Sequence, residues 1–245
     1  MKTGYLVLET KRALRSPRAL MFIVAMPVLY FFIFQGLYGG QQINNSGVTY
    51  TAYLMCSMAA FGAFMATVFT GSRTAVERSV GWQRQLRLTP LSPLGYLAAK
   101  ATVGMLVALV PVILVSLAGA LIDGVSLSPA AWLQVVLGVW VAALPFAALG
   151  LLIGQLATAE TMQIYSVVTM LLCGFLGGLW IPVTLFPTWL ASISKILPSY
   201  WLAEVGHGAL LGNHDIGTAV LVLAAWTLVL GAAVMARYRR DSARV

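Results

Sequence analysis

The stretch that decides the fold is ERSVGWQRQLRLTPLSPLGYLAAK, which occupies residues 77–100. It contains three arginines, one lysine and one glutamate, and it lies between two long apolar runs. A basic, polar segment between two such runs is expected at a membrane surface, where the chain leaves one spanning helix and begins the next. The stretch therefore predicts a membrane protein with polar segments at the ends of its spans.

The composition of the whole chain agrees with this interpretation. Hydrophobic residues make up 60% of the sequence and charged residues only 9%, whereas soluble domains carry about 25% charged residues. A spanning helix needs about 20 apolar residues, and six runs of suitable length occur. They are apolar on all sides, so we expect helices rather than barrel strands. The predicted fold is an all-α membrane protein, one domain of residues 1–245, with six spans at 19–38, 48–72, 96–122, 131–156, 162–180 and 216–236.

The basic residues predict the orientation of these spans. Cytoplasmic ends of spans carry an excess of Lys and Arg, and only Lys195 falls on the opposite side from the other fourteen cations. Both termini are therefore expected in the cytoplasm of a multi-pass cell-membrane protein. The net charge of +8 favours anionic lipids as partners, and its spread over three segments argues against nucleic acid. The fourteen cations are Lys2, Lys11, Arg12, Arg15, Arg18, Arg73, Arg78, Arg84, Arg87, Lys100, Arg237, Arg239, Arg240 and Arg244.

Residues 1–18 are predicted to form an amphipathic connector helix on the cytoplasmic surface, ended by Ser16-Pro17. Such a helix has two interpretations, a basic flank that aids insertion or an element that a cytosolic protein pushes against. The expected apolar face holds Leu6, Val7, Thr10, Ala13 and Leu14, and the expected charged face holds Lys11, Arg12 and Arg15.

Ionisable side chains are nearly absent from the predicted spans. None lies between Ala19 and Ser72, and Lys100 is interpreted as lying beside span three rather than inside it. Carriers driven by ion gradients use intramembrane ionisable groups as relays, and ion channels use charged rings or carbonyl filters. The sequence therefore favours neither class.

The glycine pairs Gly150/Gly154 and Gly174/Gly178 have the four-residue spacing that lets two helices approach closely. They predict helix packing within the chain, with a subunit interface as the alternative. Pro27, Pro111 and Pro145 lie in the middle of spans one, three and four and predict bends there.

A second unusual stretch, LWIPVTLFPTWLASISKILPSYW, occupies residues 179–201. It is too apolar for a solvated loop, and its three prolines prevent one continuous helix. We therefore expect short re-entrant outer helices over 181–206, covered by protein and able to close an exit path. The expected outer-gate residues are Gly178, Trp180, Pro182, Pro187, Trp189 and Tyr200.

Spans two and five carry methionine and aromatic side chains that adapt to apolar ligands. They are the predicted substrate path, with ordinary packing as the alternative for each residue. The path residues are Met58, Phe61, Phe64 and Met65 on span two, and Met162, Tyr165, Thr169, Met170 and Phe175 on span five.

Both unusual stretches resemble the permeases of ABC-2 type exporters, similar to the daunorubicin-resistance permeases, and the resemblance covers essentially the whole chain. In that family two permeases pair as a homo- or heterodimer, and two cytosolic ABC ATPase subunits drive them. The segment after span two, here 73–95, docks on the ATPase, and spans two and five line the path. The outer match is Gly177…Pro182…Phe186-Pro187…Trp189-Leu190…Pro198…Tyr200. The coupling residues that the resemblance implies are Glu77, Arg78, Gly81, Trp82, Leu86, Arg87, Thr89 and Pro90.

This chain departs from the family pattern at Trp82, where Thr is frequent, and at His207, where Arg is frequent. No Gly-Lys-Ser/Thr loop for ATP occurs, so we expect ATP and Mg²⁺ to bind to the partner ATPase. We also expect no catalytic residue, no metal site and no cofactor on this chain. The sequence predicts export of a hydrophobic or amphipathic compound, such as a drug or an antibiotic natural product. The alternatives are a permease for lipid-linked glycans or lipids, and a sensor or immunity subunit.

Overall fold

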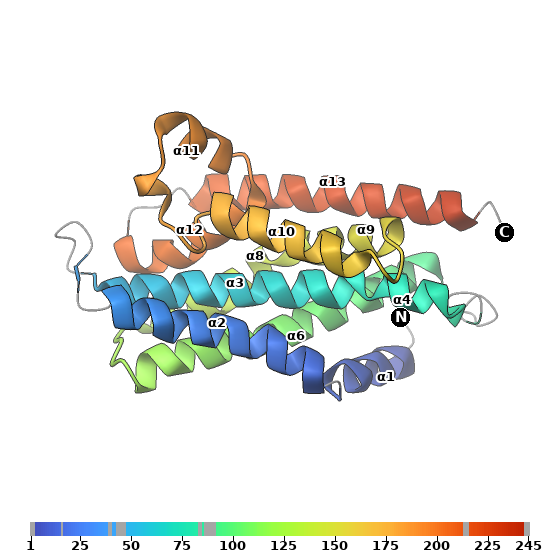
Figure 1. Cartoon of the computed structure of the whole chain (residues 1–245), viewed down its shortest axis with the longest axis horizontal. Coiled ribbons are helices and arrows are strands. Elements are labelled where there is room, and N and C mark those ends of the chain that lie inside the picture. Colours follow the sequence, from blue (N-terminus) through green and yellow to red (C-terminus); the bar gives the residue numbers. More distant parts are fainter. Residues whose placement is uncertain are drawn as a thin grey trace.

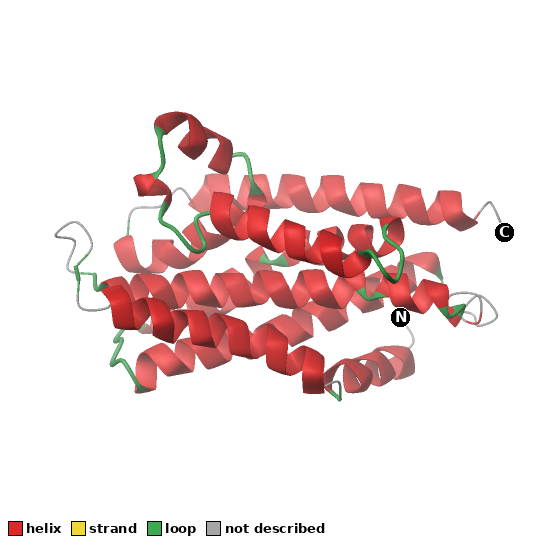
Figure 2. Ribbon diagram, viewed as in Figure 1, coloured by secondary structure: helices red, strands yellow, loops and turns green. Residues whose placement is uncertain are grey.

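The computed structural model describes residues 3–15, 17–38, 41–42, 48–82, 85, 92–212 and 216–242. Within these ranges the chain is helical, and the extended pairing is one isolated bridge between Gln42 and Thr49 (Figure 2). The helices are α1 (Thr3–Leu14), α2 (Pro17–Tyr38), α3 (Tyr50–Ser72), α4 (Thr74–Ser79), α6 (Pro93–Leu121), α7 (Pro129–Leu133), η1 (Gln134–Gly138), α8 (Val139–Ala142), α9 (Leu144–Leu156), α10 (Met162–Leu176), η2 (Val183–Leu185), α11 (Thr188–Ser194), α12 (Pro198–Leu211) and α13 (Ile216–Ser242).

The all-helical prediction is confirmed, and the described residues contain 5 helical segments long and apolar enough to cross a membrane. The run expected as span five is shorter than the others. Helix α10 has 15 residues, a length of about 22 Å against a hydrocarbon core of about 30 Å. It ends at a turn in which Gly178 has a φ of +73°, a conformation that glycine adopts easily. The five long segments are Leu20–Tyr38, Tyr50–Ser79, Leu94–Leu121, Pro129–Leu156 and Ile216–Arg240.

Helix α3 runs through the middle of the bundle, with α2, α6, α9 and α12 packed around it (Figure 1). Near the middle of α3, Gly62 has no side chain, and the neighbouring helices approach the backbone closely there. A Cβ atom there would lie 2.6 Å from Cβ of Pro111 and 3.3 Å from Cγ of Pro27. Both prolines lie inside continuous helices, α6 and α2. Both rings therefore lie close to α3 at Gly62, where no side chain stands in the way.

The backbones of α3 and α9 touch through glycine. A Cβ on Gly150 would lie 2.6 Å from the Val68 carbonyl oxygen, and one on Gly154 would collide with Thr74. The prediction that this glycine pair packs within the chain is confirmed. The other predicted pair does not form a helix contact: Gly174 lies beneath the Trp180 ring, and Gly178 lies beyond the end of α10.

Span four is interrupted where Pro145 predicts a bend. Helix α8 ends at Ala142, α9 begins at Leu144, and a π-helical turn, η1, precedes α8. Pro145 lacks the N–H that would continue the helix.

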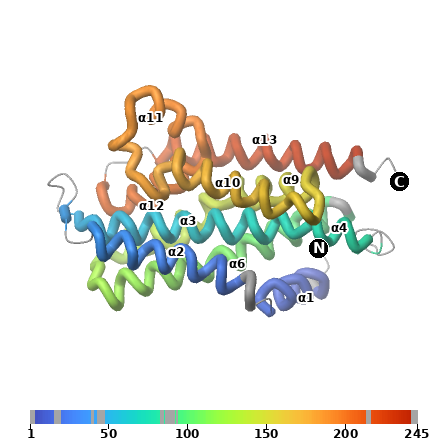
Figure 3. The backbone as a smooth tube through the Cα atoms, viewed as in Figure 1, coloured from blue at the N-terminus to red at the C-terminus, as the bar shows by residue number. Residues whose placement is uncertain are grey.

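Helix α1 and the C-terminal end of α13 lie at one end of the bundle, and α11 projects at the other (Figures 1 and 3).

Candidate functional site

A buried lysine joins three helices at the end of the bundle that holds α1. Lys100 of α6 is 4% exposed. Its Nζ lies 2.5 Å from Oε2 of Glu9 on α1 and 2.5 Å from Oε1 of Glu77 on α4. The Tyr96 hydroxyl, one turn earlier on α6, donates to Oε2 of Glu77 over 3.2 Å. We call Glu9, Glu77, Tyr96 and Lys100 the Lys100 cluster. It holds α1 and α4 against α6 through charge-assisted hydrogen bonds.

The charges of the Lys100 cluster do not balance among the buried groups. Two carboxylates share one ammonium, and the next cation, Arg12, is 58% exposed with its Nη1 3.7 Å from Oε1 of Glu77. Oε1 of Glu9 is buried and has no hydrogen-bond partner. A buried charged oxygen without a partner is costly. Lys100 alone therefore does not balance the two carboxylates, and the partly exposed Arg12 adds positive charge beside Glu77.

One sequence-based expectation is corrected here. Lys100 lies inside span three, because α6 begins at Pro93 after the N-cap Ser92. The face of α1 that meets the rest of the chain includes part of the predicted apolar face. Leu6 and Ala13 pack on the core, Val7 and Leu14 are exposed, and Tyr5 and Glu9 point inward. The pairing of Glu9 with Lys100 turns this face toward α6.

Tyr5 adds an aromatic contact beside the Lys100 cluster. Its ring centroid lies 6.5 Å from that of Tyr96. Burial, and then the nearby Glu9 carboxylate, raise the pKa of Tyr5 above its ordinary value. The phenol is therefore neutral and adds no charge to the cluster.

The predicted coupling segment begins on α4 and is anchored by Arg78. Its Nη1 donates to the carbonyl oxygen of Gly154 over 3.1 Å and to that of Gln155. These carbonyls end α9, where a cation is favoured. Gly81 has a φ of +73°, and the Arg12 guanidinium lies 6.0 Å from the Trp82 ring centre. The structure thus brings four coupling residues together, while Leu86, Arg87, Thr89 and Pro90 lie outside the described residues.

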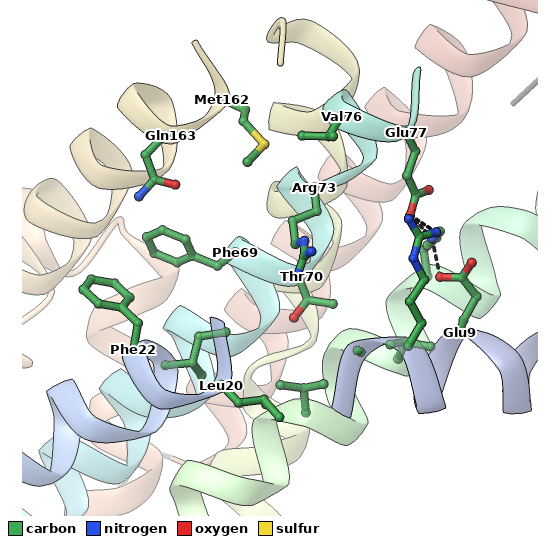
Figure 4. Close-up of a pocket in the computed structure, with 16 residues that line it drawn as sticks. Glu9, Leu20, Phe22, Phe69, Thr70, Arg73, Val76, Glu77, Met162 and Gln163 are labelled. Carbon is green, nitrogen blue, oxygen red and sulfur yellow. Dashed lines mark hydrogen bonds and ion pairs between the residues drawn. The ribbon is translucent and has the colours of Figure 1, made fainter. Parts of the chain in front are cut away.

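A pocket of about 410 Å³ opens beside the Lys100 cluster, between α1, α2, α3, α4, α6 and α10. Figure 4 shows Phe22 and Phe69 side by side on one wall, with ring centroids 6.0 Å apart. The wall is apolar on one side and charged on the other, so the pocket suits an amphipathic molecule. Its lining consists of Leu20, Phe22, Ile23, Phe69, Val76, Val103, Val107, Met162 and Ala13 on the apolar side, and Glu9, Arg12, Thr70, Arg73, Glu77, Lys100 and Gln163 on the polar side.

The residues predicted to form the substrate path fall into two groups. Met58, Phe61, Phe64 and Met65 of α3 are fully buried by the rest of the chain. On α10, Met162 and Met170 pack against this core, Thr169 is half-buried, and Tyr165 and Phe175 are exposed. Helices α3 and α10 contact one another. Of the nine path residues, Met162 alone lines the pocket described above.

Among the residues predicted to form the outer gate, Trp180 packs against three aromatic rings. Its ring meets those of Phe61 at 5.2 Å, Phe175 at 5.9 Å and Tyr30 at 6.0 Å between centroids. It therefore connects the turn after α10 to both α2 and α3.

The other gate residues lie around short elements at the same end. Gly178 is buried in the turn. Pro182 precedes η2, and the exposed Pro187 precedes α11. Trp189 on α11 is 65% exposed, and Tyr200 on α12 packs edge-on against Trp201.

Sequence reasoning missed one buried polar contact near the end of the bundle that holds α11. His207 Nε2 lies 2.8 Å from Oγ of Ser57. The imidazole also stacks on Tyr53, with centroids 3.7 Å apart, and its Nδ1 lies 3.8 Å from Glu204 Oε1. The signal in the sequence was the departure from the family pattern at His207, but nothing local indicated Ser57. The contact ties α12 to α3.

Comparison with known proteins gives two results. The family model described as "ABC-2 type transporter" matches residues 6–211. The chain is also similar to the "Putative transport permease YvfS" of Bacillus subtilis (strain 168), with 30% identity over 224 residues that cover 91% of each chain. The family match includes α1, α4, α6 and α12, so it covers both ends of the bundle described above.

Proposed function

Because the chain belongs to the ABC-2 type transporter family, we propose that it is the membrane subunit of an ATP-driven exporter. A pair of such permeases, identical or different, works with two cytosolic ABC ATPase subunits that bind ATP and Mg²⁺. The exported compound is hydrophobic or amphipathic. The amphipathic lining of the pocket between α2 and α10 supports this class of substrate over a fully polar one.

The proposed topology has six crossings, with α10 as the short fifth. Five crossings would leave the two ends of the chain on opposite sides of the membrane. Helix α1 and the C-terminal end of α13 instead lie at the same end of the bundle (Figure 1), which supports an even number. The excess of basic residues at that end supports a cytoplasmic location for it. Helices α11 and α12 then form the outer cap.

One observation carries the proposed coupling mechanism: the buried Lys100 ammonium binds both Glu9 and Glu77. The ATPase would push on the coupling segment that begins with α4. Because Lys100 holds α1 and α4 against α6, a force on α4 is passed to α1 and α6 together. Arg78 passes it to α9 as well, through the carbonyls at the end of that helix. In this mechanism α1, α4, α6 and the end of α9 move together as one rigid unit.

The proposal is tested by expressing the chain with an ABC ATPase encoded beside it. We expect the two proteins to copurify, and we expect cells to expel a fluorescent amphipathic dye only when the ATPase has its Walker lysine. Efflux that continues without that lysine would contradict the proposal. Copurification without efflux of any hydrophobic compound, including lipid-linked glycans, would favour the sensor function instead.

The docking surface is tested with Val80→Asp. Val80 is exposed at the end of α4, next to the turn at Gly81, so its substitution should weaken ATPase binding without disturbing the core. Glu160→Lys is the matched control, because Glu160 is exposed in the α9–α10 connection. ATPase binding that is unchanged by Val80→Asp would locate the contact elsewhere.

A further inference from the structure

The accessible charges of the pocket beside the Lys100 cluster are positive. Arg12 and Arg73 line the pocket and are exposed. The two carboxylates of the lining, Glu9 and Glu77, are buried, and Lys100 binds both of them. Among the described residues of the lining, three cations stand against two carboxylates. A ligand that enters therefore meets the two arginines first, and guanidinium groups favour an anion such as a phosphate.

The lining becomes apolar toward the middle of the bundle. On α6, the side chains that line the pocket are Lys100, Val103 and Val107, and the last of these lies about 10 Å farther along the helix than the first. On α3 the order is the same, because Phe69 lies one turn farther into the bundle than Arg73 (Figure 4). Charge at the end of the bundle and apolar side chains toward its middle match the polarity of a phospholipid in one leaflet.

The pocket lies at the level where the spans reach one membrane surface. Leu20 and Phe22 belong to the first two turns of α2, and Met162 and Gln163 begin α10. Arg73 directly follows the last residue of α3. This end of the bundle is the one proposed to face the cytoplasm, where anionic lipids give the membrane a negative surface. Basic pockets between spanning helices on that side are suited to anionic headgroups.

We propose that this pocket binds a phospholipid with an anionic headgroup, its phosphate on Arg12 and Arg73 and the start of one acyl chain against Phe22 and Phe69. The volume of about 410 Å³ takes this part of the molecule, and the rest of the lipid lies in the bilayer. Because Arg12 belongs to α1 and Arg73 joins α3 to α4, the bound phosphate ties α1 to the end of α3. This lipid site goes beyond the proposed export function and takes from it only the cytoplasmic location of this end.

The test labels the purified chain in phosphatidylcholine nanodiscs, without any ATPase. Two photoreactive tracer lipids carry the same acyl chain, with a diazirine near its carbonyl end, and differ only in a phosphatidylglycerol or a phosphatidylcholine headgroup. Peptide mass spectrometry after irradiation locates the label. We expect the phosphatidylglycerol tracer to label the start of α2 and the end of α3 about fivefold more, the preference that one basic side chain near a membrane surface provides. Equal labelling by the two tracers, or label spread evenly over the chain, would overturn the proposal.

Substitutions separate a specific site from general attraction to a basic surface. Arg12→Gln and Arg73→Gln should each lower the preference for phosphatidylglycerol, and the double substitution should abolish it without changing the phosphatidylcholine signal. Arg239→Gln is the matched control, because Arg239 is an exposed arginine of α13 at the same end of the bundle and does not line the pocket. An equal loss from Arg239→Gln would mean that overall charge attracts the lipid, and would contradict the site. Phe22→Ala should weaken labelling by both tracers to the same extent.

A final arm distinguishes a membrane lipid from a free anionic amphiphile. Unlabelled phosphatidylglycerol should displace the tracer, and dodecyl phosphate at the same mole fraction should displace less of it. Stronger displacement by dodecyl phosphate would identify a free amphiphile as the occupant and overturn the lipid assignment. The assay contains no ATPase and measures no transport, so its failure would leave the proposed export function standing. Failure of efflux would likewise leave the labelling result intact.

Discussion

The two ends of the bundle are held together by different forces. At the α1 end, the Lys100 cluster joins three helices with buried, charge-assisted hydrogen bonds, and Arg78 fixes the end of α9. At the other end, α12 is tied to α3 by the Ser57–His207 hydrogen bond and by aromatic packing around Trp180. Helix α11 makes few contacts there, and Trp189 on it is exposed.

This difference indicates which end can change its packing at lower cost. Breaking a buried ion pair leaves an unpaired charge, which costs about 3–5 kcal/mol, whereas separating one hydrogen-bonded pair costs about 1 kcal/mol. We therefore expect the α1 end to move as a unit and the α11–α12 end to rearrange during transport. The predictions below are ordered by the size of the effect they should produce.

The largest effect is expected from Lys100→Met. It leaves Glu9 and Glu77 facing one another without the shared ammonium, so we expect a loss of about 3–5 kcal/mol. This should appear as a much lower midpoint of thermal unfolding in detergent. Adding Glu9→Gln and Glu77→Gln to Lys100→Met should restore most of the loss, because no buried charge then remains. Lys195→Met, at an exposed position, should change little.

A smaller loss is expected from Gly150→Ala, because its Cβ would meet the backbone of Val68 at 2.6 Å. Backbone atoms cannot turn away as a flexible side chain can, so α3 and α9 must separate. Overpacking of this kind costs about 1–3 kcal/mol. Gly231→Ala is the matched control, since a Cβ there has nothing within 4 Å. Equal unfolding midpoints for the two variants would contradict the close contact of α3 with α9.

The contact between α3 and α12 is tested by a double-mutant cycle on Ser57→Ala and His207→Phe. The Nε2–Oγ distance of 2.8 Å predicts a coupling energy of about 1 kcal/mol. Thermal unfolding of the two single variants and the double variant gives this value. A coupling as large as the effect of Lys100→Met would remove the contrast between the two ends.

The smallest effect concerns the exposed side of α11. In a chain with Cys56 and Cys173 replaced by alanine, a cysteine at Ile193 should react slowly with a membrane-impermeant thiol reagent on intact cells. The chain itself leaves this apolar side chain exposed, and we expect lipid or a second permease to cover it. A cysteine at the exposed Gln42 serves as the fast control. Equal rates would mean that this side of α11 faces water.

The sequence predicted the elements of the fold better than the contacts of the site. Runs of apolar residues predicted the long helices, because the length and composition of a single run are enough to identify a spanning helix. The length of α10 was overestimated, since hydropathy does not register the turn at Gly177 and Gly178. The contact of α1 with α6 was not predicted, because it depends on Glu9, which lies outside the predicted apolar face.

The buried polar contacts could not be predicted for a physical reason. Glu9 and Lys100 are separated by 91 positions, and Ser57 and His207 by 150. No local periodicity links such residues, and each one alone resembles a surface or packing residue. The contact made by the glycines of α9 was easier to predict, because glycines four residues apart are a recurring local pattern where two helices approach closely.

The central claim, that the α1 end moves as one unit, is tested most directly by spin-label distances in the complex with its ATPase. One pair of labels, at Leu8 on α1 and Leu94 on α6, measures the distance between these helices beside the Lys100 cluster. A second pair, at Trp189 on α11 and Leu121 on α6, measures the distance at the opposite end of the bundle. All four positions are exposed. Distances are compared without nucleotide and with ATP trapped by vanadate. The account predicts an unchanged distance for the first pair and a changed distance for the second. A change in the first pair, or no change in either, would contradict it.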